Sequence, residues 1–245
     1  MTKEEVLQQC TVSENVVKLP EGHLDRKVYL EVKKSLELIG GKWKGGKVFG
    51  FVFSSDPTEL LSNVANGENR NLKKEFQFFA TPDKLADYLV LLANIKKTDI
   101  ILEPQAGQGA IVQAIKRAGY DSLIFCCELM EANKLILQDI KNVDIICDDF
   151  LKLHKATNIF DKIIANPPFS KNQDIDHIRK MYIHLDEGGR MVSVASKHWV
   201  NSNRKKETEF KDWLIEVGAE VKDVPEGTFK KSGTLVGAKI IIINK

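Results

Sequence analysis

The chain has 245 residues, of which 43% are hydrophobic, enough for one α/β domain with a proper core and a small extension. No apolar run approaches the roughly 20 residues of a membrane span and no signal-peptide pattern opens the chain, so we expect a cytoplasmic protein without a membrane partner. The net charge of +2 excludes a surface that is basic throughout, and any nucleic-acid contact must be local.

The four cysteines, Cys10, Cys126, Cys127 and Cys147, show no metal-ligand spacing. The last three lie in apolar stretches typical of strands and are therefore predicted to be buried free thiols. Five scattered histidines add no ligand cluster, and no metal cofactor is expected.

Residues 1–70 are predicted to form a small α+β extension, and residues 72–245 the main domain. The extension is expected to contain, in order, a strand, a helix, a strand and a short helix, at residues 16–19, 25–39, 48–53 and 57–64. The polar residues 66–71 indicate a linker. Because the extension is too short for a large core, we expect it to dock on the main domain.

A glycine-rich segment at residues 40–47 is predicted to be the turn between the helix and the second strand of the extension. It carries Lys42, Trp43 and Lys44. Cations beside an aromatic ring suit contacts to phosphates and stacking on a base, so these three residues are candidates for substrate binding. A solvated turn without such a function is the alternative interpretation.

The main domain begins with a strand at residues 99–102, a glycine loop, and a helix at residues 111–118. This order is the first unit of a dinucleotide-type fold. Gly107 and Gly109 permit positive φ and close backbone approach to a ligand, although Ala106-Gly107-Gln108-Gly109 lacks the full G-x-G-x-x-G spacing.

The residues before these glycines, Glu103 and Pro104, indicate the charge of the ligand. A carboxylate at this position suits a cationic ligand better than a pyrophosphate. S-adenosylmethionine carries a positive sulfonium and a positive ammonium, and Glu103 could pair with the ammonium directly or through water.

Acidic residues also end the next two strands. The strand at residues 122–127 is followed by Glu128, which is placed to accept hydrogen bonds from ribose hydroxyls. The strand at residues 143–147 is followed by Asp148, Asp149 and Phe150. There, a carboxylate could accept from the adenine amino group of the cofactor while Phe150 stacks on the ring.

A fourth strand at residues 160–165 ends in the candidate catalytic residues Asn166, Pro167, Pro168 and Phe169. Ligands bind at the carboxyl ends of strands in open α/β sheets. Two prolines fix two φ angles and remove two N–H donors. The turn therefore presents hydrogen-bond acceptors in fixed positions beside an aromatic ring. Such a turn suits a planar substrate that carries an NH2 group.

The rest of the chain completes the alternation of helices and strands. A helix to residue 185 begins near Asp174, Asp176 and His177, which are expected to cap it, with an acid/base pair as the alternative. Gly188-Gly189 is expected to end that helix. A strand at 190–195, a helix at 208–217 and strands at 220–224 and 238–244 follow, which suggests an antiparallel final hairpin.

The ordered motifs resemble those of class I S-adenosylmethionine-dependent amino-methyltransferases, in particular the bacterial and phage DNA adenine-N6 methyltransferases. Residues 103–109 resemble the D/E-P-x-A-G-x-G loop, Asp149-Phe150 the D-F pair, and residues 166–169 the N-P-P-Y/F motif. Phe79-Ala80-Thr81-Pro82 resembles the F-x-T-P segment, and Gly227-Thr228-Phe229 with Thr234 a late motif. The resemblance covers about residues 75–245.

This resemblance implies a Rossmann-like α/β fold with a mostly parallel seven-stranded sheet and an antiparallel last strand. It also implies S-adenosylmethionine as cofactor, with Thr81 and Pro82 over its methionine part, and DNA as the partner. The target adenine would be flipped into the pocket of the N-P-P-F motif, where Phe229 contacts it.

One departure from the family concerns sequence recognition. Members with this motif order that recognise a defined site carry a long recognition domain after the catalytic core, whereas this sequence stops at Lys245. The N-terminal extension or a separate specificity subunit is expected to take over that role. The sequence does not decide between a monomer and a dimer.

Three alternatives stay open. An RNA adenine or guanine amino-methyltransferase shares the N-P-P-F/Y motif. A protein glutamine methyltransferase acts on a similar planar amide, although such enzymes usually show a D-x-G-T/S-G loop that this chain lacks. A non-catalytic nucleic-acid-binding subunit could keep the fold, but it need not keep both Asn166 and Glu103.

Overall fold

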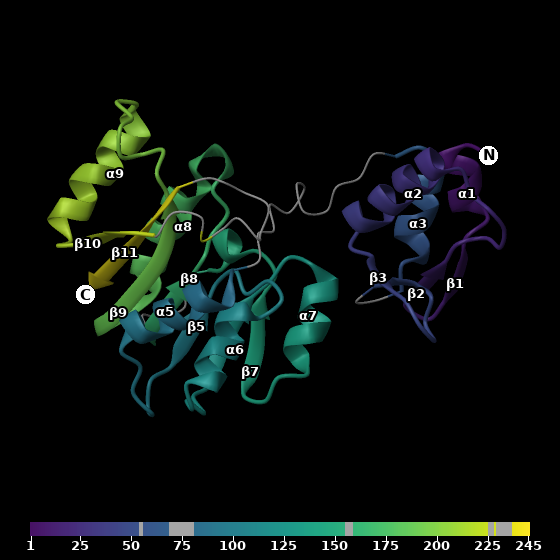
Figure 1. Cartoon of the computed structure of the whole chain (residues 1–245). Helices are drawn as coiled ribbons and strands as arrows, with labels where there is room; N and C mark the ends of the chain where they lie inside the picture. Colours follow the sequence, from purple (N-terminus) through teal and green to yellow (C-terminus); the bar gives the residue numbers. More distant parts are fainter. Residues whose placement is uncertain (54–55, 69–80, 155–158, 225–227, 229–236) are drawn as a thin grey trace. The chain divides into compact units, whose positions relative to one another are not determined.

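The computed structural model describes residues 1–53, 56–68, 81–154, 159–224, 228 and 237–245 (Figure 1). The chain divides into two compact units, Met1–Phe78 and Phe79–Lys245. Each unit has its own hydrophobic core. Among the described residues, no helix is both long and apolar enough to cross a membrane.

The N-terminal unit combines a small antiparallel sheet with helices. Its strands pair in the order β1-β2-β4-β3. The strands are β1 (Thr11–Ser13), β2 (Val16–Lys18), β3 (Lys42–Lys44) and β4 (Gly50–Val52), and the described helices are α1 (Lys3–Gln8), α2 (Arg26–Leu38) and α3 (Thr58–Ala65). The Asp25 side chain caps α2 by accepting from the Lys27 and Val28 N–H groups, which fixes where that helix starts.

The segment with Lys42, Trp43 and Lys44 is strand β3, and its prediction as a turn is wrong. Trp43 lies opposite the buried Phe51 of β4. The alternation of lysine and tryptophan therefore places Trp43 on the same face as Phe51 and the two lysines on the other face, although all three side chains are exposed.

The second unit contains a seven-stranded sheet with the order β10-β11-β9-β8-β5-β6-β7. All neighbouring strands pair in parallel except β11, which is antiparallel to both β9 and β10. The strands are β5 (Ile101–Glu103), β6 (Ile124–Cys127), β7 (Val143–Cys147), β8 (Phe160–Ala165), β9 (Leu185–Ser196), β10 (Glu220–Asp223) and β11 (Ala238–Asn244). The predicted fold class is therefore confirmed.

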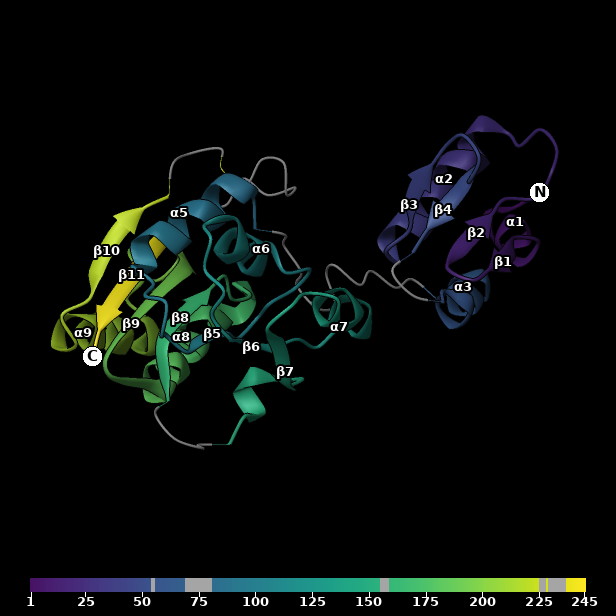
Figure 2. The same cartoon turned by 90° about the horizontal axis from the view of Figure 1, so that it is seen from below.

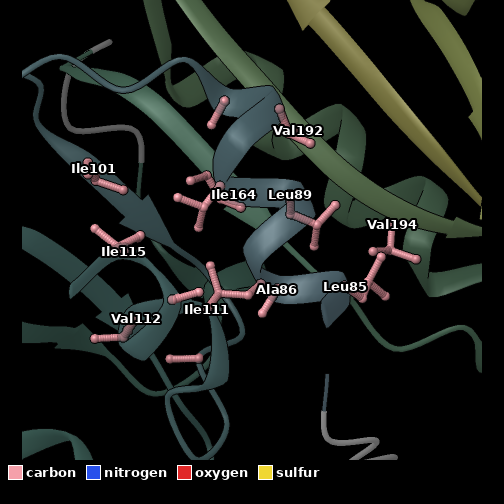
Figure 3. Packing of buried hydrophobic residues seen from close by; sticks show 14 of the residues in the cluster. Leu85, Ala86, Leu89, Ile101, Ile111, Val112, Ile115, Ile164, Val192 and Val194 are labelled. Atoms are coloured by element: carbon pink, nitrogen blue, oxygen red, sulfur yellow. The ribbon is translucent and has the colours of Figure 1, made fainter. Parts of the chain in front are cut away.

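Helices cover both faces of this sheet, so the unit has three layers (Figure 2). On one face lie α5 (Asp83–Ala93), α6 (Ala110–Arg117) and α7 (Glu131–Gln138), and on the other α8 (Gln173–His184) and α9 (Lys205–Glu216). Figure 3 shows Leu85 and Leu89 of α5 and Ile111 and Ile115 of α6 gathered over the strands. This packing holds the carboxyl ends of the parallel strands in place.

The glycine pair Gly188-Gly189 does not end the helix before it, contrary to the prediction. Helix α8 ends at His184, and strand β9 already begins at Leu185. The Gly188 N–H donates to the Lys245 carbonyl at 2.8 Å, and a Cβ on Gly189 would lie 2.8 Å from the Asp186 carbonyl oxygen. The glycines therefore permit a close backbone approach within the strand.

The prediction of three buried free thiols is correct only for Cys126. Cys127 and Cys147 form a disulfide. They end the neighbouring strands β6 and β7 and lie directly opposite in the register, with their Cα atoms 4.8 Å apart. That separation lies within the range that a disulfide spans, and the pairing of the strands could not be read from cysteine spacing.

Candidate functional site

Four strand ends meet at one edge of the sheet. Because β5, β6, β7 and β8 run parallel and are neighbours in the order β8-β5-β6-β7, their carboxyl ends lie side by side. These ends carry Glu103, Glu128, Asp148 and Asn166. The polar residues that the sequence places after successive strands are thus brought to the same edge, where open α/β sheets bind ligands.

The glycine loop after β5 has the backbone that its sequence requires. Gly107 and Gly109 have φ angles of 56° and 78°, in the left-handed region that favours glycine. A Cβ on Gly109 would also lie 3.1 Å from Leu137 of α7. The loop is held to the sheet because the Ala106 N–H donates to the Cys127 carbonyl at 3.1 Å.

Glu128 acts as a bridge between this loop and the start of α7. One carboxylate oxygen accepts from the Gly107 N–H at 2.7 Å. The other accepts from the Met130 N–H at 2.7 Å and from the Asn133 amide at 3.1 Å. The residue predicted to bind ribose hydroxyls therefore also fixes the loop, and a carboxylate has enough lone pairs for both tasks.

Glu103 is a buried carboxyl at the base of the loop, with 2% of its surface exposed. Burial raises its pKa well above 4.5; the Val112 N–H bond to Oε2 at 3.1 Å lowers it, and the negative Glu128 raises it further. Burial is the larger effect, so the folded protein favours the protonated carboxyl more than a free glutamate does. A cation placed beside it would favour the charged form and pair with it.

The N-P-P-F turn presents an oriented amide. The Asn166 amide nitrogen donates to the Thr81 hydroxyl at 3.1 Å, so the amide oxygen Oδ1 is the free end of the group. Within the described residues, Oδ1 accepts no hydrogen bond. Pro167 is buried, and Phe169 is partly buried against the core under α5 and α6. Pro82 occupies the position before the first residue of α5.

The residues after β7 are engaged with the protein itself. Asp148 pairs with Lys134 at 2.7 Å, and the Asp149 carboxylate accepts from the Leu151 N–H at 3.0 Å. Phe150 is 2% exposed, and its ring lies parallel to the His177 ring at a centroid distance of 5.9 Å. Its burial places the ring in the core, so stacking of Phe150 on a cofactor stays a prediction.

A polar contact that the sequence analysis missed joins the glycine loop to α8. The Gln105 amide nitrogen lies 2.7 Å from Nδ1 of His177. Burial lowers the pKa of His177 to about 4, so this hydrogen bond joins the Gln105 amide to a neutral imidazole. The helical spacing of apolar residues along α8 places His177 on the core-facing side of the helix. The sequence does not indicate its partner Gln105, which lies 72 residues away.

The expected cap of α8 is wrong in its details. Asn172 occupies the N-cap position and makes no side-chain cap bond. Asp174 is fully buried, and its carboxylate accepts from the Ser196 N–H at 2.8 Å at the end of β9. Asp176 pairs with Lys206 of α9 at 2.6 Å. Both acids lie in the first turn of α8, as expected, and both also join the helix to other elements.

Several predicted site residues belong to the N-terminal unit or fall outside the described residues. Lys42, Trp43 and Lys44 belong to the N-terminal unit. Phe229, Gly227, Thr234, Phe79 and Ala80 lie outside the described residues. Within the described ranges, no three His, Cys, Asp or Glu side chains are grouped so as to hold a metal ion.

Comparison with known sequences finds relatives of part of the chain. No protein-family model matches. A probable ribosomal RNA small subunit methyltransferase A from Methanococcus maripaludis is 30% identical over 110 residues, and the type II methyltransferase M.AccI from Acinetobacter calcoaceticus is 32% identical over 111 residues. Each match covers 43% of this chain. The chain spans 41% of the first relative and 20% of the second, less than half of either.

Comparison with solved structures identifies the fold. A protein from Listeria monocytogenes described as a class I S-adenosylmethionine-dependent methyltransferase matches with a TM-score of 0.52 and 13% identity, over 77% of this chain and 66% of its own. A modification subunit of a type I restriction enzyme from Vibrio vulnificus matches with 0.56 and 14%, over 92% and 58%. The main unit therefore has the Rossmann-like methyltransferase fold.

Proposed function

We propose that this chain is a methyltransferase that moves the methyl group of S-adenosylmethionine to the exocyclic N6 amine of adenine in DNA. The observation that carries the proposal is the Asn166 amide. Thr81 fixes its nitrogen, so that its free oxygen lies at the strand edge that also carries Glu103 and Glu128. Methyl transfer to an amine requires a hydrogen-bond acceptor that holds the amine, placed beside a binding site for the positively charged methyl donor.

The residues at the edge fit the cofactor. Glu103 is a buried carboxyl whose pKa is raised by burial, and an ammonium placed beside it would favour the charged form and make an ion pair with it. Gly107 and Gly109 leave the backbone open to close approach, and Glu128 holds Gly107 in place through its N–H group. Pro104, Thr81 and Pro82 are proposed to line the methionine part, and Asp148, Asp149 and Phe150 the adenosine part.

The chemistry then depends mainly on positioning. The adenine amine is a poor nucleophile because its lone pair is delocalised into the ring. We expect its two N–H groups to donate to Asn166 Oδ1 and to the Pro167 carbonyl, which favours a pyramidal nitrogen and directs the lone pair toward the sulfonium methyl. The nitrogen forms the new bond to carbon, sulfur takes the electrons of the broken bond, and the nitrogen loses a proton to water.

The substrate pocket is proposed to use aromatic rings. Phe169 follows the acceptor turn and would stack on one face of the base, while Phe229 is the candidate for a second contact. An adenine paired inside a duplex cannot reach such a pocket, so the base must be flipped out or already unpaired.

The archaeal relative supports RNA as a second candidate substrate, because that protein is named as a ribosomal RNA methyltransferase. M.AccI, named as a type II methyltransferase, matches the chain with similar identity. The motifs before β5 and at the glycine loop favour the DNA adenine group. The likeness to a modification subunit supports a separate specificity subunit as a partner.

The proposal is tested by tritiated-methyl transfer from S-adenosylmethionine. Duplex DNA, single-stranded DNA, total RNA and protein extract serve as parallel substrates, and the labelled nucleosides are then identified. We expect N6-methyladenine in DNA. Label confined to RNA or to protein glutamine would overturn the DNA assignment. Absence of cofactor binding would overturn the enzyme assignment and leave a nucleic-acid-binding subunit.

A further inference from the structure

The sheet of the N-terminal unit has one covered face and one open face. The strand residues Val17 and Phe51 are fully buried on the covered face, in one cluster with Val6, Leu7, Val32, Leu36 and Leu61 of the helices. Because side chains alternate along a strand, the neighbours of Val17 and Phe51 lie on the other face. Helices are therefore packed on only one side of this sheet among the residues that the structure describes.

The open face is basic. The register pairs Lys42 with Val52, Lys44 with Gly50, and Thr11 with Lys18, which places three lysines on the face opposite Phe51. All three lysines are exposed, and none has an ion-pair partner in the described part of the chain. The other strand residues on that face are neutral, namely Thr11, Ser13, Val16, Gly50 and Val52.

Two exposed aromatic rings stand at the edge of this sheet. Trp43 of the edge strand β3 is 37% exposed, and Phe49 in the following loop is 69% exposed. The two rings meet edge to face, with centroids 5.3 Å apart, and Trp43 in turn contacts the buried Phe51 at 5.1 Å. Phe49 therefore has one side against a ring anchored in the core and the other side in water.

The backbone at Phe49 holds the ring in this exposed position. Its φ angle is 41°, in a region that bulky residues rarely adopt. Within the described unit, the one ring contact of Phe49 is with Trp43, and most of its surface is exposed. The loop also carries Lys47, which is exposed and has no ion-pair partner within the described residues.

We propose that this basic-aromatic face binds unpaired nucleotides of a nucleic-acid strand. The basic-aromatic face comprises Lys18, Lys42 and Lys44 of the open face and, at the β3 edge of the sheet, Lys47 with Phe49 and Trp43, whose ring lies on the side of Phe51. The lysines would contact phosphates, and the strand would turn over the β3 edge so that a base stacks on the exposed side of Phe49, with Trp43 as its support. The inference deepens the proposed function by giving its substrate a second binding surface, but it does not depend on the Asn166 chemistry.

The test is binding of the full-length protein to a fluorescein-labelled oligo(dT), measured by anisotropy at several salt concentrations. The probe contains no adenine, so it isolates the surface from methyl transfer. We expect Phe49→Ser to weaken binding by about five- to a hundredfold. We expect the double variant Lys42→Gln/Lys44→Gln to reduce the salt slope by about 0.7 for each phosphate contact that is lost.

Leu30→Ser is the matched control, because Leu30 is 52% exposed on α2 in the same unit but away from the sheet strands. It should bind oligo(dT) as the unchanged protein does, and circular dichroism should show that all variants are folded. Absence of binding by the unchanged protein, equal affinity of the Phe49 variant, or tighter binding of a blunt duplex of equal length would each overturn the proposal.

The two proposals fail in different ways. If the unchanged protein methylates adenine but its oligo(dT) affinity is insensitive to the Phe49 and lysine changes, only the basic-aromatic face is wrong. If the face binds oligo(dT) as expected but no substrate pool accepts a methyl group, only the proposed reaction is wrong.

Discussion

At the scale of single residues, the proposed chemistry depends most directly on the Asn166 amide. Its nitrogen is bound to Thr81, so its oxygen is the group left to accept from a substrate amine. We expect Asn166→Ala to slow methyl transfer by about a hundredfold or more, since it removes an oriented contact to the reacting group. Single-turnover transfer and calorimetric cofactor binding should separate the effects, and unchanged transfer would contradict the mechanism.

The buried Glu103 carboxyl should make stability depend on pH. Its pKa in the folded protein is raised by burial, so it favours folding while protonated and loses this contribution as pH rises from its unfolded value near 4.5 through its folded value. The Glu103→Gln variant has no titratable carboxyl at this position. We therefore expect the free energy of unfolding of this variant to increase relative to the unchanged protein between pH 5 and pH 8.

Urea unfolding at the two pH values measures this difference. The exposed Glu216→Gln on α9 is the control, and its difference from the unchanged protein should stay constant. A constant difference for Glu103→Gln as well would show that the carboxyl is charged in the free protein.

His177 should have the opposite pH dependence. Burial lowers its pKa to about 4, below the unfolded value near 6.5, so the folded state is favoured while the imidazole is neutral. This contribution is present above pH 6.5 and is lost as pH falls toward 4, by up to about 3 kcal/mol. In urea unfolding, His177→Asn should reduce the loss of unfolding free energy between pH 6.5 and pH 4. The control His23→Asn, at an exposed position, should leave that loss unchanged.

At the scale of elements, the packing of the glycine loop against α7 can be tested by comparing alanine substitutions at two glycines. Gly109 and Gly119 both have positive φ, at 78° and 84°. A Cβ on Gly109 would lie 3.1 Å from Leu137, whereas a Cβ on Gly119 would meet nothing within 4 Å. Gly119→Ala should lower stability by about 1 kcal/mol through backbone strain alone.

Gly109→Ala should lower stability by about 1 kcal/mol more than Gly119→Ala, because it adds the contact with α7 to the same strain. Thermal unfolding of the two variants compares them directly. Equal losses would show that α7 moves aside without a penalty.

The elements that the sequence predicted well are strands that contain consecutive isoleucines. The strands at 143–147, 160–165 and 238–244 coincide with β7, β8 and β11, which carry Ile145-Ile146, Ile163-Ile164 and the isoleucines at 240–243, and β-branched residues favour a strand. Their order also placed the candidate residues at one edge. Strand β3 was missed because its lysines and glycines favour a turn, and only its pairing with Phe51 shows that it is a strand.

Within the candidate site, the sequence predicted which residues end the strands but not what they bind. The Glu128 contact to Gly107 spans 21 residues, and the Asn166 contact to Thr81 spans 85. Such contacts depend on side-chain orientation across the fold, which local propensity does not contain. The same limit applies to the Cys127–Cys147 disulfide and to the Gln105–His177 hydrogen bond.

At the scale of the whole molecule, the hydrophobic cores of the two units are built from very different stretches of sequence. The N-terminal core uses residues within the first 65, whereas the cores of the second unit join residues from 85 to 243. A short loop closes sooner than a long one, so contacts within the first unit should form more rapidly.

The position of β11 determines the order in which the second unit can fold during synthesis. β11 separates β9 from β10 and hydrogen-bonds to both along its length. Until residues 238–244 have left the ribosome, β9 has a long unpaired apolar edge and β10 has no neighbour in the sheet. The N-terminal unit can fold while translation continues, but the seven-stranded sheet must wait, and the nascent chain must keep that edge from pairing with other chains until β11 is inserted.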